Sequence, residues 1–73
     1  MLEYEVLDRI EMGENTTVTV YGSPYRFKVG NYVMDKNKNR YRIKSVVSPS
    51  ANIEDIMSLI LLQGVFNDKV FYM

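Results

Sequence analysis

Residues 26–47 have the sequence RFKVGNYVMDKNKNRYRIKSVV, in which alternating apolar and basic side chains flank a polar turn. Alternation with a period of two is typical of a strand that buries one face. The Asp and Asn residues of DKNKN favour a turn, because they accept left-handed backbone angles and bond to their own main chain. We therefore predict strands over 25–29, 32–34 and 40–47, with a turn at Gly30–Asn31 and a hairpin loop at 35–39. The residues expected to face inward are Phe27, Val29, Tyr41 and Ile43, with Ser45 as a further candidate.

Two more strands are predicted before this stretch, joined by a turn at Gly13. The first covers residues 3–10, where the apolar neighbours Val6 and Leu7 interrupt the alternation and indicate a β-bulge. The second covers 16–21 (TTVTVY), which has the clearest alternation of the chain. Its two valines are expected to face the core and Thr17, Thr19 and Tyr21 to face outward, or the reverse if the strand lies at an edge.

The remaining elements are predicted near the C-terminus. Residues 53–62 leave helix and strand open, because Ile53, Ile56, Met57 and Ile60 have helical spacing whereas the apolar run over 59–62 is typical of a strand buried on both faces. Our interpretation is a short helical turn over 53–56 followed by a buried strand over 57–63. Residues 64–73 predict a hairpin around Asn67–Asp68 with a terminal strand over 70–72. Short strands separated by turn signals every 8 to 12 residues or so are the signature of a small barrel or sandwich. We expect residues 1–73 to form one all-β domain: a small, closed or partly open, six- to seven-stranded antiparallel β-barrel with at most one short helical turn.

Composition excludes several classes of site. The chain has 73 residues with 47% apolar and 25% charged side chains, as expected for a folded globular domain. It contains neither cysteine nor histidine, so a disulfide is impossible and a transition-metal site would rest on carboxylates alone. DKNKN resembles the start of a calcium loop, but Arg40 stands where such loops need glycine and Val46 where they need glutamate. We expect no metal and no cofactor.

Catalytic constellations are also missing from the sequence. Without histidine or cysteine, the common nucleophile–base pairs cannot form. Glu3 and Glu5 share one strand face, but this pattern is more typical of a solvated acidic face than of acid–base chemistry. We therefore expect that the protein is not an enzyme.

Charge is unevenly distributed along a chain whose net charge is zero. Seven of its nine basic residues lie within residues 26–44, whereas five of its nine acidic residues lie within residues 1–14. Period-two spacing places much of the positive charge on strand faces. Such a basic stripe, with Tyr21 or Tyr32 available for stacking, suits nucleic acid. The candidate nucleic-acid-binding residues are Arg26, Lys28, Arg40, Arg42 and Lys44.

The same basic residues are also compatible with a purely structural role. Basic side chains on outward strand positions keep strand edges soluble and prevent unwanted pairing. The acidic N-terminal strand could also lie beside the basic strand and neutralise it through cross-strand pairs. A domain of this size has a thin core, which favours a protein partner or self-association, and an exposed patch of Tyr, Met and Leu side chains would mark that surface. We expect a protein-binding module, with nucleic-acid binding as the alternative.

Residues 26–48 resemble part of the β-barrel second domain of translational GTPases such as elongation factor Tu, where a G-x-hydrophobic-K-x-G-D-x-V turn precedes a strand. Asn31 stands where that family usually has Asp. Residues 3–22 are similar to the family's first two strands, and SLILLQGVF (58–66) to its later buried strand. The resemblance implies a closed barrel of about six or seven strands that contacts partner domains, tRNA ends or ribosomal RNA. It includes no GTPase domain and so implies no nucleotide hydrolysis. The residues that carry the pattern are Phe27, Lys28, Val29, Gly30, Tyr32 and Val33.

No segment is apolar for the roughly 20 residues that a membrane-spanning helix needs. The first fifteen residues, MLEYEVLDRIEMGEN, are acidic and lack the basic start and apolar block of a signal peptide. We therefore expect a cytoplasmic protein without membrane contact.

Overall fold

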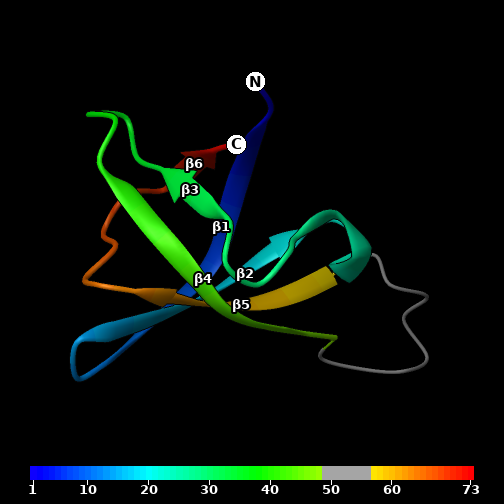
Figure 1. The fold of residues 1–73 in the computed structure, drawn as a ribbon, viewed down its shortest axis with the longest axis horizontal. Coiled ribbons are helices and arrows are strands. Elements are labelled where there is room, and N and C mark those ends of the chain that lie inside the picture. The colour runs from blue at the N-terminus through cyan, green and yellow to red at the C-terminus, as the bar shows by residue number, and fades with distance from the viewer. Residues whose placement is uncertain (49–56) are drawn as a thin grey trace.

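Six antiparallel strands close into a barrel in the computed structural model of the chain, which describes residues 1–48 and 57–73 (Figure 1). The predicted fold class, a small all-β barrel, is confirmed. Around the barrel the strands follow the order β1-β2-β5-β4-β3-β6, so two strands far apart in sequence, β1 and β6, close the wall. The strands are β1 (Glu3–Met12), β2 (Asn15–Tyr21), β3 (Tyr32–Met34), β4 (Arg40–Val47), β5 (Met57–Gln63) and β6 (Val70–Tyr72).

Side-chain alternation fills the barrel interior, as the sequence predicts. On β2 and β5 every second residue is fully buried, and Val18 lies opposite Ile60 across the β2–β5 ladder. Aromatic rings complete the core: the ring centroids of Phe27 and Phe71 lie 6.2 Å apart in an edge-to-face arrangement, and Phe66 packs on Phe71 in the same way at 6.3 Å. The buried apolar residues are Val18, Val20, Phe27, Val33, Ile43, Ile60, Leu62, Phe66 and Phe71.

Two β-bulges change which side chains face inward. The predicted irregularity near Val6 and Leu7 is confirmed, because the β1–β2 register shifts between Val6 and Asp8. A second bulge at Lys44, which the alternation does not predict, shifts the β4–β5 register between Ile43 and Ser45. Beyond it Val46 packs against the core, so the inward position expected for Ser45 is wrong.

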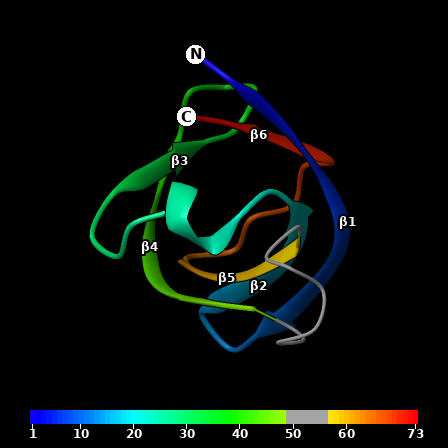
Figure 2. The same ribbon diagram turned by 90° about the vertical axis from the view of Figure 1, so that its right-hand side faces the viewer.

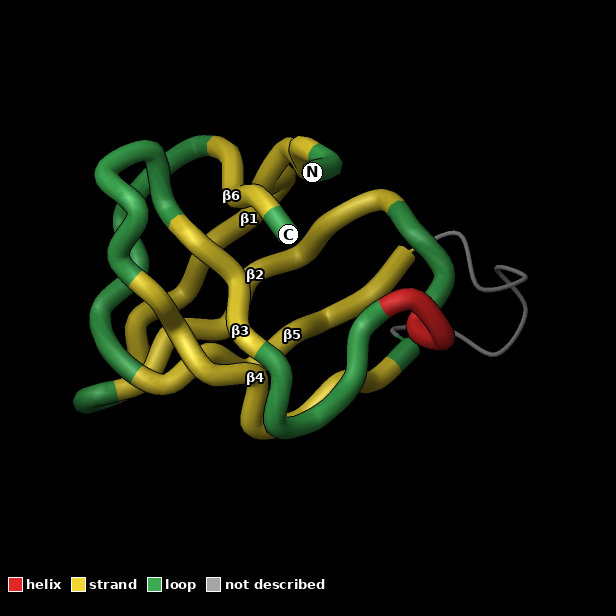
Figure 3. The backbone as a smooth tube through the Cα atoms, turned by 45° about the horizontal axis from the view of Figure 1, so that its top comes forward, coloured by secondary structure: helices red, strands yellow, loops and turns green. Residues whose placement is uncertain are grey.

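Residues 25–29 do not form the predicted strand. Instead Pro24–Arg26 form a 3₁₀ turn, η1, which crosses the end of the barrel and is the one helical piece among the described residues (Figures 2 and 3). The Ser23 hydroxyl accepts a hydrogen bond from the Tyr25 N–H, and Pro24 suits the first position of such a turn. Of the two side chains of this segment expected inward, Phe27 is buried but Val29 is 66% exposed, and Tyr25, which would share their face in a strand, is 84% exposed.

The predicted hairpin around Asn67–Asp68 is also wrong. β5 pairs with β2 and β4, whereas β6 pairs with β1 and β3, so residues 64–69 connect two distant places in the wall. The buried Thr16 hydroxyl holds this connection, since it donates to the Gly64 carbonyl at 2.8 Å and accepts from the Phe66 N–H at 2.9 Å. The terminal strand itself is confirmed. The helical turn predicted over 53–56 lies outside the described residues.

Across the part of the chain that the structure describes, no helix has the length and apolar character needed to cross a membrane.

Candidate functional site

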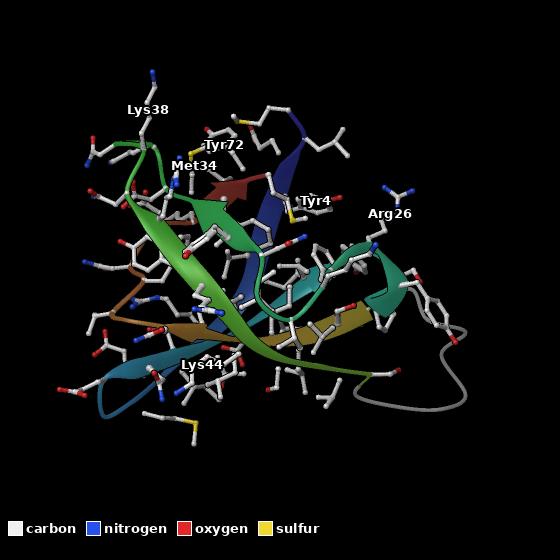
Figure 4. All side chains as sticks on the ribbon, viewed as in Figure 1. Tyr4, Arg26, Met34, Lys38, Lys44 and Tyr72 are labelled. Atoms are coloured by element: carbon white, nitrogen blue, oxygen red, sulfur yellow. The ribbon has the colours of Figure 1, made fainter. Side chains whose placement is uncertain are left out.

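The structure divides the five basic residues predicted to bind nucleic acid. Arg40 and Arg42 project outward from β4, as expected from their spacing. Lys44 is exposed at the β4 bulge, and Lys28 belongs to a turn rather than to a strand. Arg26 lies on η1, well apart from Lys38 and Lys44 (Figure 4). The five side chains therefore do not form one straight stripe, and the strand face expected to join Arg26 to Lys28 is absent.

Arg40 and Tyr32 form the most specific contact on the basic side of the barrel. The guanidinium carbon of Arg40 lies 5.7 Å from the centroid of the Tyr32 ring, within the range of a cation–π interaction. Tyr32 is 48% exposed, and Arg42 is its cross-strand neighbour. Within residues 1–48 and 57–73, the only ion pair joins Arg9 to Glu11, so the cations of β4 have no carboxylate partner there. A planar or anionic group could reach both a ring and two cations at this place.

The acidic N-terminal strand does not neutralise these cations. β1 pairs with β2 and β6, and two strands separate it from β4 on either side of the closed wall. The arrangement in which β1 lies beside the basic strand is therefore excluded.

Two shallow hollows lie where β3 meets β6, a junction we call the β3–β6 seam. One hollow, of about 500 Å³, is lined by Tyr32, Met34, Arg40 and Tyr72 among others. The second, of about 460 Å³, shares Met34 and Tyr72 and reaches the loop that carries Lys38 (Figure 4). Together their linings contain methionine and tyrosine side chains, the cations of Lys36, Lys38 and Arg40, and the carboxylate residue Asp35.

Asp35 organises the loop at 35–39 from a buried position. Its carboxylate accepts hydrogen bonds from the backbone N–H groups of Asn37 and Asn39, from the Asn39 side chain and from the Tyr41 hydroxyl, all at 2.9 to 3.0 Å. Burial raises the pKa of this carboxyl, but the hydrogen bonds from Asn39, Tyr41 and Asn37 outweigh burial and hold the pKa below its ordinary value. The carboxylate therefore acts as the acceptor that holds the DKNKN segment in its loop conformation.

The pKa of Tyr41 is shifted in the opposite direction, upward. Burial, the hydrogen bond to Asp35 and the negative charges of Asp35 and Asp68 raise the pKa of Tyr41 to about 12. The phenol is therefore neutral at physiological pH and acts as a donor that ties the loop to the barrel wall.

An uncharged surface lies on the outside of β5, and the sequence alone does not predict it. Leu59 and Leu61 point outward between their neighbours on β2 and β4, and both are only half-buried. Val47 lies opposite Leu59 and is 52% exposed. We call this surface the β5 face. It consists of Ile10, Thr17, Thr19, Tyr21, Ser45, Val47, Met57, Leu59 and Leu61.

The sequence contains signals for the β5 face and for the β3–β6 seam, but these signals can be interpreted only when the strand order is known. The apolar run over 59–62 indicates a strand buried on both faces, yet a single-layer barrel wall covers only its inner face. The seam depends on which residues of two three-residue strands pair, and neither strand has enough alternation to specify its register.

No three His, Cys, Asp or Glu side chains of the described residues come together where they could hold a metal ion.

No known protein family, curated protein or solved structure matches the chain.

Proposed function

We propose that this protein is a non-catalytic protein-binding module that acts in the cytoplasm and uses the β5 face as its main contact surface. The observation that carries the proposal is a run of uncharged outward positions on β2, β5 and the end of β4, which reaches Ile10 on β1 and is bounded there by Asp8, the cross-strand partner of Thr19. A quarter of the chain is charged, so an uncharged area of this extent is unusual on a barrel exterior.

The composition of the β5 face agrees with a contact surface. Interface centres are depleted in charged residues and enriched in Tyr and Met, and this face contains Tyr21 and Met57 beside its two leucines. The bulge at Lys44 turns Val47 outward and so extends the apolar area from β5 onto β4. The resemblance to the barrel of translational GTPases supports the same class of function, because that domain contacts partner domains.

Site-specific photo-crosslinking tests the proposal. Val47 and Val65 are replaced, one at a time, by benzoylphenylalanine in the chain expressed in its own cells. The two valines are matched in exposure, at 52% and 50%, but Val65 lies in the β5–β6 connection and outside the β5 face. We expect a protein adduct from position 47 and much less from position 65.

The adducts are identified by mass spectrometry after nuclease treatment. Equal yields at the two positions, or no protein adduct at position 47, would overturn the proposal. An adduct at position 47 that nuclease removes would also overturn it, because the contact would then be with nucleic acid.

A second candidate function is nucleic-acid binding by the β4 cations. It is favoured by Arg40 stacked on the half-exposed ring of Tyr32, because guanidinium groups and aromatic rings bind phosphates and bases respectively. Fluorescence anisotropy with mixed single-stranded RNA at low salt tests it. We expect the Arg40→Gln, Arg42→Gln double variant to weaken binding and to reduce the salt dependence, with Arg26→Gln on η1 as the matched control. Absence of binding at low salt, or an equal loss with Arg26→Gln, rejects this candidate.

A further inference from the structure

We infer that the β5 face binds a second copy of this chain, packed about a two-fold axis so that Asp8 of each copy lies against Lys44 of the other. The inference rests on the function proposed above, because it names the protein that the β5 face binds. It is carried by two opposite charges that lie at opposite borders of an otherwise uncharged surface.

The cross-strand register arranges the outward side chains of the β5 face in rows that run from β1 to β4. One row begins with Asp8 on β1 and ends with Val47 on β4. The adjacent row begins with Ile10 and ends with Ser45, beside which the bulge residue Lys44 is exposed where β4 crosses β5 (Figure 4). The carboxylate and the ammonium group thus lie at opposite borders, one row apart and roughly 14 Å apart across the strands.

Neither of these two charges has an ion-pair partner in the described parts of the chain, where the one ion pair joins Arg9 to Glu11. The barrel wall keeps Asp8 and Lys44 apart, since β2 and β5 lie between β1 and β4. They can pair with each other only between two molecules. The net charge of the chain is zero, so two copies can approach without long-range repulsion.

A two-fold axis turns the two borders into contacts. In a dimer that packs face to face, the same surface meets itself about an axis in the plane of the interface. An axis along the strands, between β2 and β5, sets the β1 border of each copy on the β4 border of the other, which pairs Asp8 with Lys44 twice. An axis across the strands would set each border on itself and bring like charges together. Charge therefore selects the first orientation, and a modest tilt of the axis compensates for the offset of one row.

The centre of this dimer is apolar. The axis passes beside Leu59, so the two Leu59 side chains contact each other, and the ion pairs lie at the rim. With strands about 4.8 Å apart and a rise of about 3.3 Å per residue, the face measures roughly 20 by 20 Å. That area of about 400 Å² per copy is half of the roughly 800 Å² per partner in stable complexes. The dimer should therefore be weak and reversible, with a Kd of about 10–100 µM.

Sedimentation equilibrium of the full chain at low salt, from about 10 µM to about 1 mM, tests the inference. Asp8→Lys and Lys44→Asp each set like charges against one another, and the axis repeats the change, so each should weaken the dimer at least about tenfold. The double variant with both substitutions should return to within about threefold of wild type. Glu3→Lys makes the same change of charge on β1 at a position paired with β6, and it should leave the Kd unchanged.

An engineered thiol locates the axis independently of the charges. The chain contains no cysteine, so Leu59→Cys introduces a single thiol. A short bismaleimide should join two Leu59→Cys chains efficiently. The same reagent should join far fewer Val65→Cys chains, because position 65 lies in the β5–β6 connection and outside the β5 face.

Three results would each overturn the inference: a monomer at every concentration up to about 1 mM, a double charge variant as weak as the single variants, or equal crosslinking at positions 59 and 65. The function proposed above is tested separately. If the chain is monomeric and position 47 still captures a different protein in cells, the protein-binding role of the β5 face stands and the second copy is rejected. If position 47 captures no protein, both are rejected.

Discussion

The Tyr41 hydroxyl donates a 2.9 Å hydrogen bond to Oδ2 of Asp35, and the Tyr41 ring packs edge-on against Phe66 at a centroid distance of 5.0 Å. One side chain thus joins the loop at 35–39 to the aromatic core. The same loop borders the β3–β6 seam through Lys38. The order of the 35–39 loop, the packing of the aromatic core and the shape of the β3–β6 seam are therefore coupled. A change in the protonation of Asp35 or Tyr41 should alter all three.

Stability should fall in acid because of Asp35. Its pKa is below the ordinary value of 3.8 in the folded protein, so the unfolded chain takes up the proton first as the pH falls. Its stabilising contribution is present above the unfolded pKa and is lost as the pH drops through the folded pKa. Asp35→Asn should lower the melting temperature at neutral pH and flatten its acid dependence. Thermal unfolding at a series of pH values measures both effects, and Asp8→Asn, on the exposed part of β1, should retain the wild-type slope.

Stability should also fall in alkali because of Tyr41. Its pKa is raised from 10.0 to about 12 by folding, so the unfolded chain loses the proton first. The contribution of the neutral phenol is present below pH 10 and is lost as the pH rises toward 12. Ultraviolet titration should show a late tyrosine step near pH 12, and Tyr41→Phe should remove that late step. Tyr25→Phe, at an exposed site, should leave it; if the late step persists in Tyr41→Phe, the assignment is wrong.

Thr16→Val should destabilise the barrel by about 1–3 kcal/mol, because it removes the partner of a carbonyl and of an N–H at the barrel end. For a domain of this size, that corresponds to a fall in the melting temperature of roughly 4–8 °C per kcal/mol. Thr17→Val, at the next and outward position, should stay within about 0.5 kcal/mol of wild type. Equal stabilities for the two variants, measured by urea unfolding, would contradict the role given to the Thr16 hydroxyl.

Gly22→Ala should destabilise the fold by about 1–3 kcal/mol, because φ is +144° and a Cβ there would lie 3.3 Å from the Phe27 ring. Gly13 is the matched control: its φ of +65° suits asparagine, and nothing lies within 4 Å of a Cβ at that site. Gly13→Asn should therefore cost less than about 1 kcal/mol. Guanidinium unfolding compares the two, and a larger loss for Gly13→Asn would show that the close approach of Gly22 to Phe27 is unimportant.

Alternation predicted the strands over 16–21 and 40–47, and the apolar run predicted the strand over 57–63. The strands over 40–47 and 57–63 have the predicted bounds, and Val18 and Val20 face inward as expected. The prediction of a strand over 25–29 was wrong because the Ser23 cap and Pro24 favour a local turn. Pro24 has no N–H to donate to the hydrogen-bond ladder of a sheet. The hairpin at Asn67–Asp68 failed because burial of Phe66 and its bond to Thr16 outweigh the local turn preference.

The candidate sites were less predictable than the fold. The outward direction of Arg40 and Arg42 follows from spacing alone, but their contact with Tyr32 depends on the β3–β4 register. The sequence alone could not show that Arg26 lies apart from Arg40 and Arg42, because this depends on the replacement of a predicted strand by η1. The β5 face requires the strand order, since β2 and β4 become neighbours of β5 only when the barrel closes.

Titration of the protein captured at position 47 tests the central claim, that the β5 face binds a protein, most directly. The captured protein is purified and titrated by calorimetry with wild type, Val47→Lys and Val65→Lys chains. Because a lysine at position 47 puts a charge opposite Leu59 in the uncharged face, Val47→Lys should weaken binding at least about tenfold, while Val65→Lys stays within about twofold. Equal affinities for the two variants would contradict the claim.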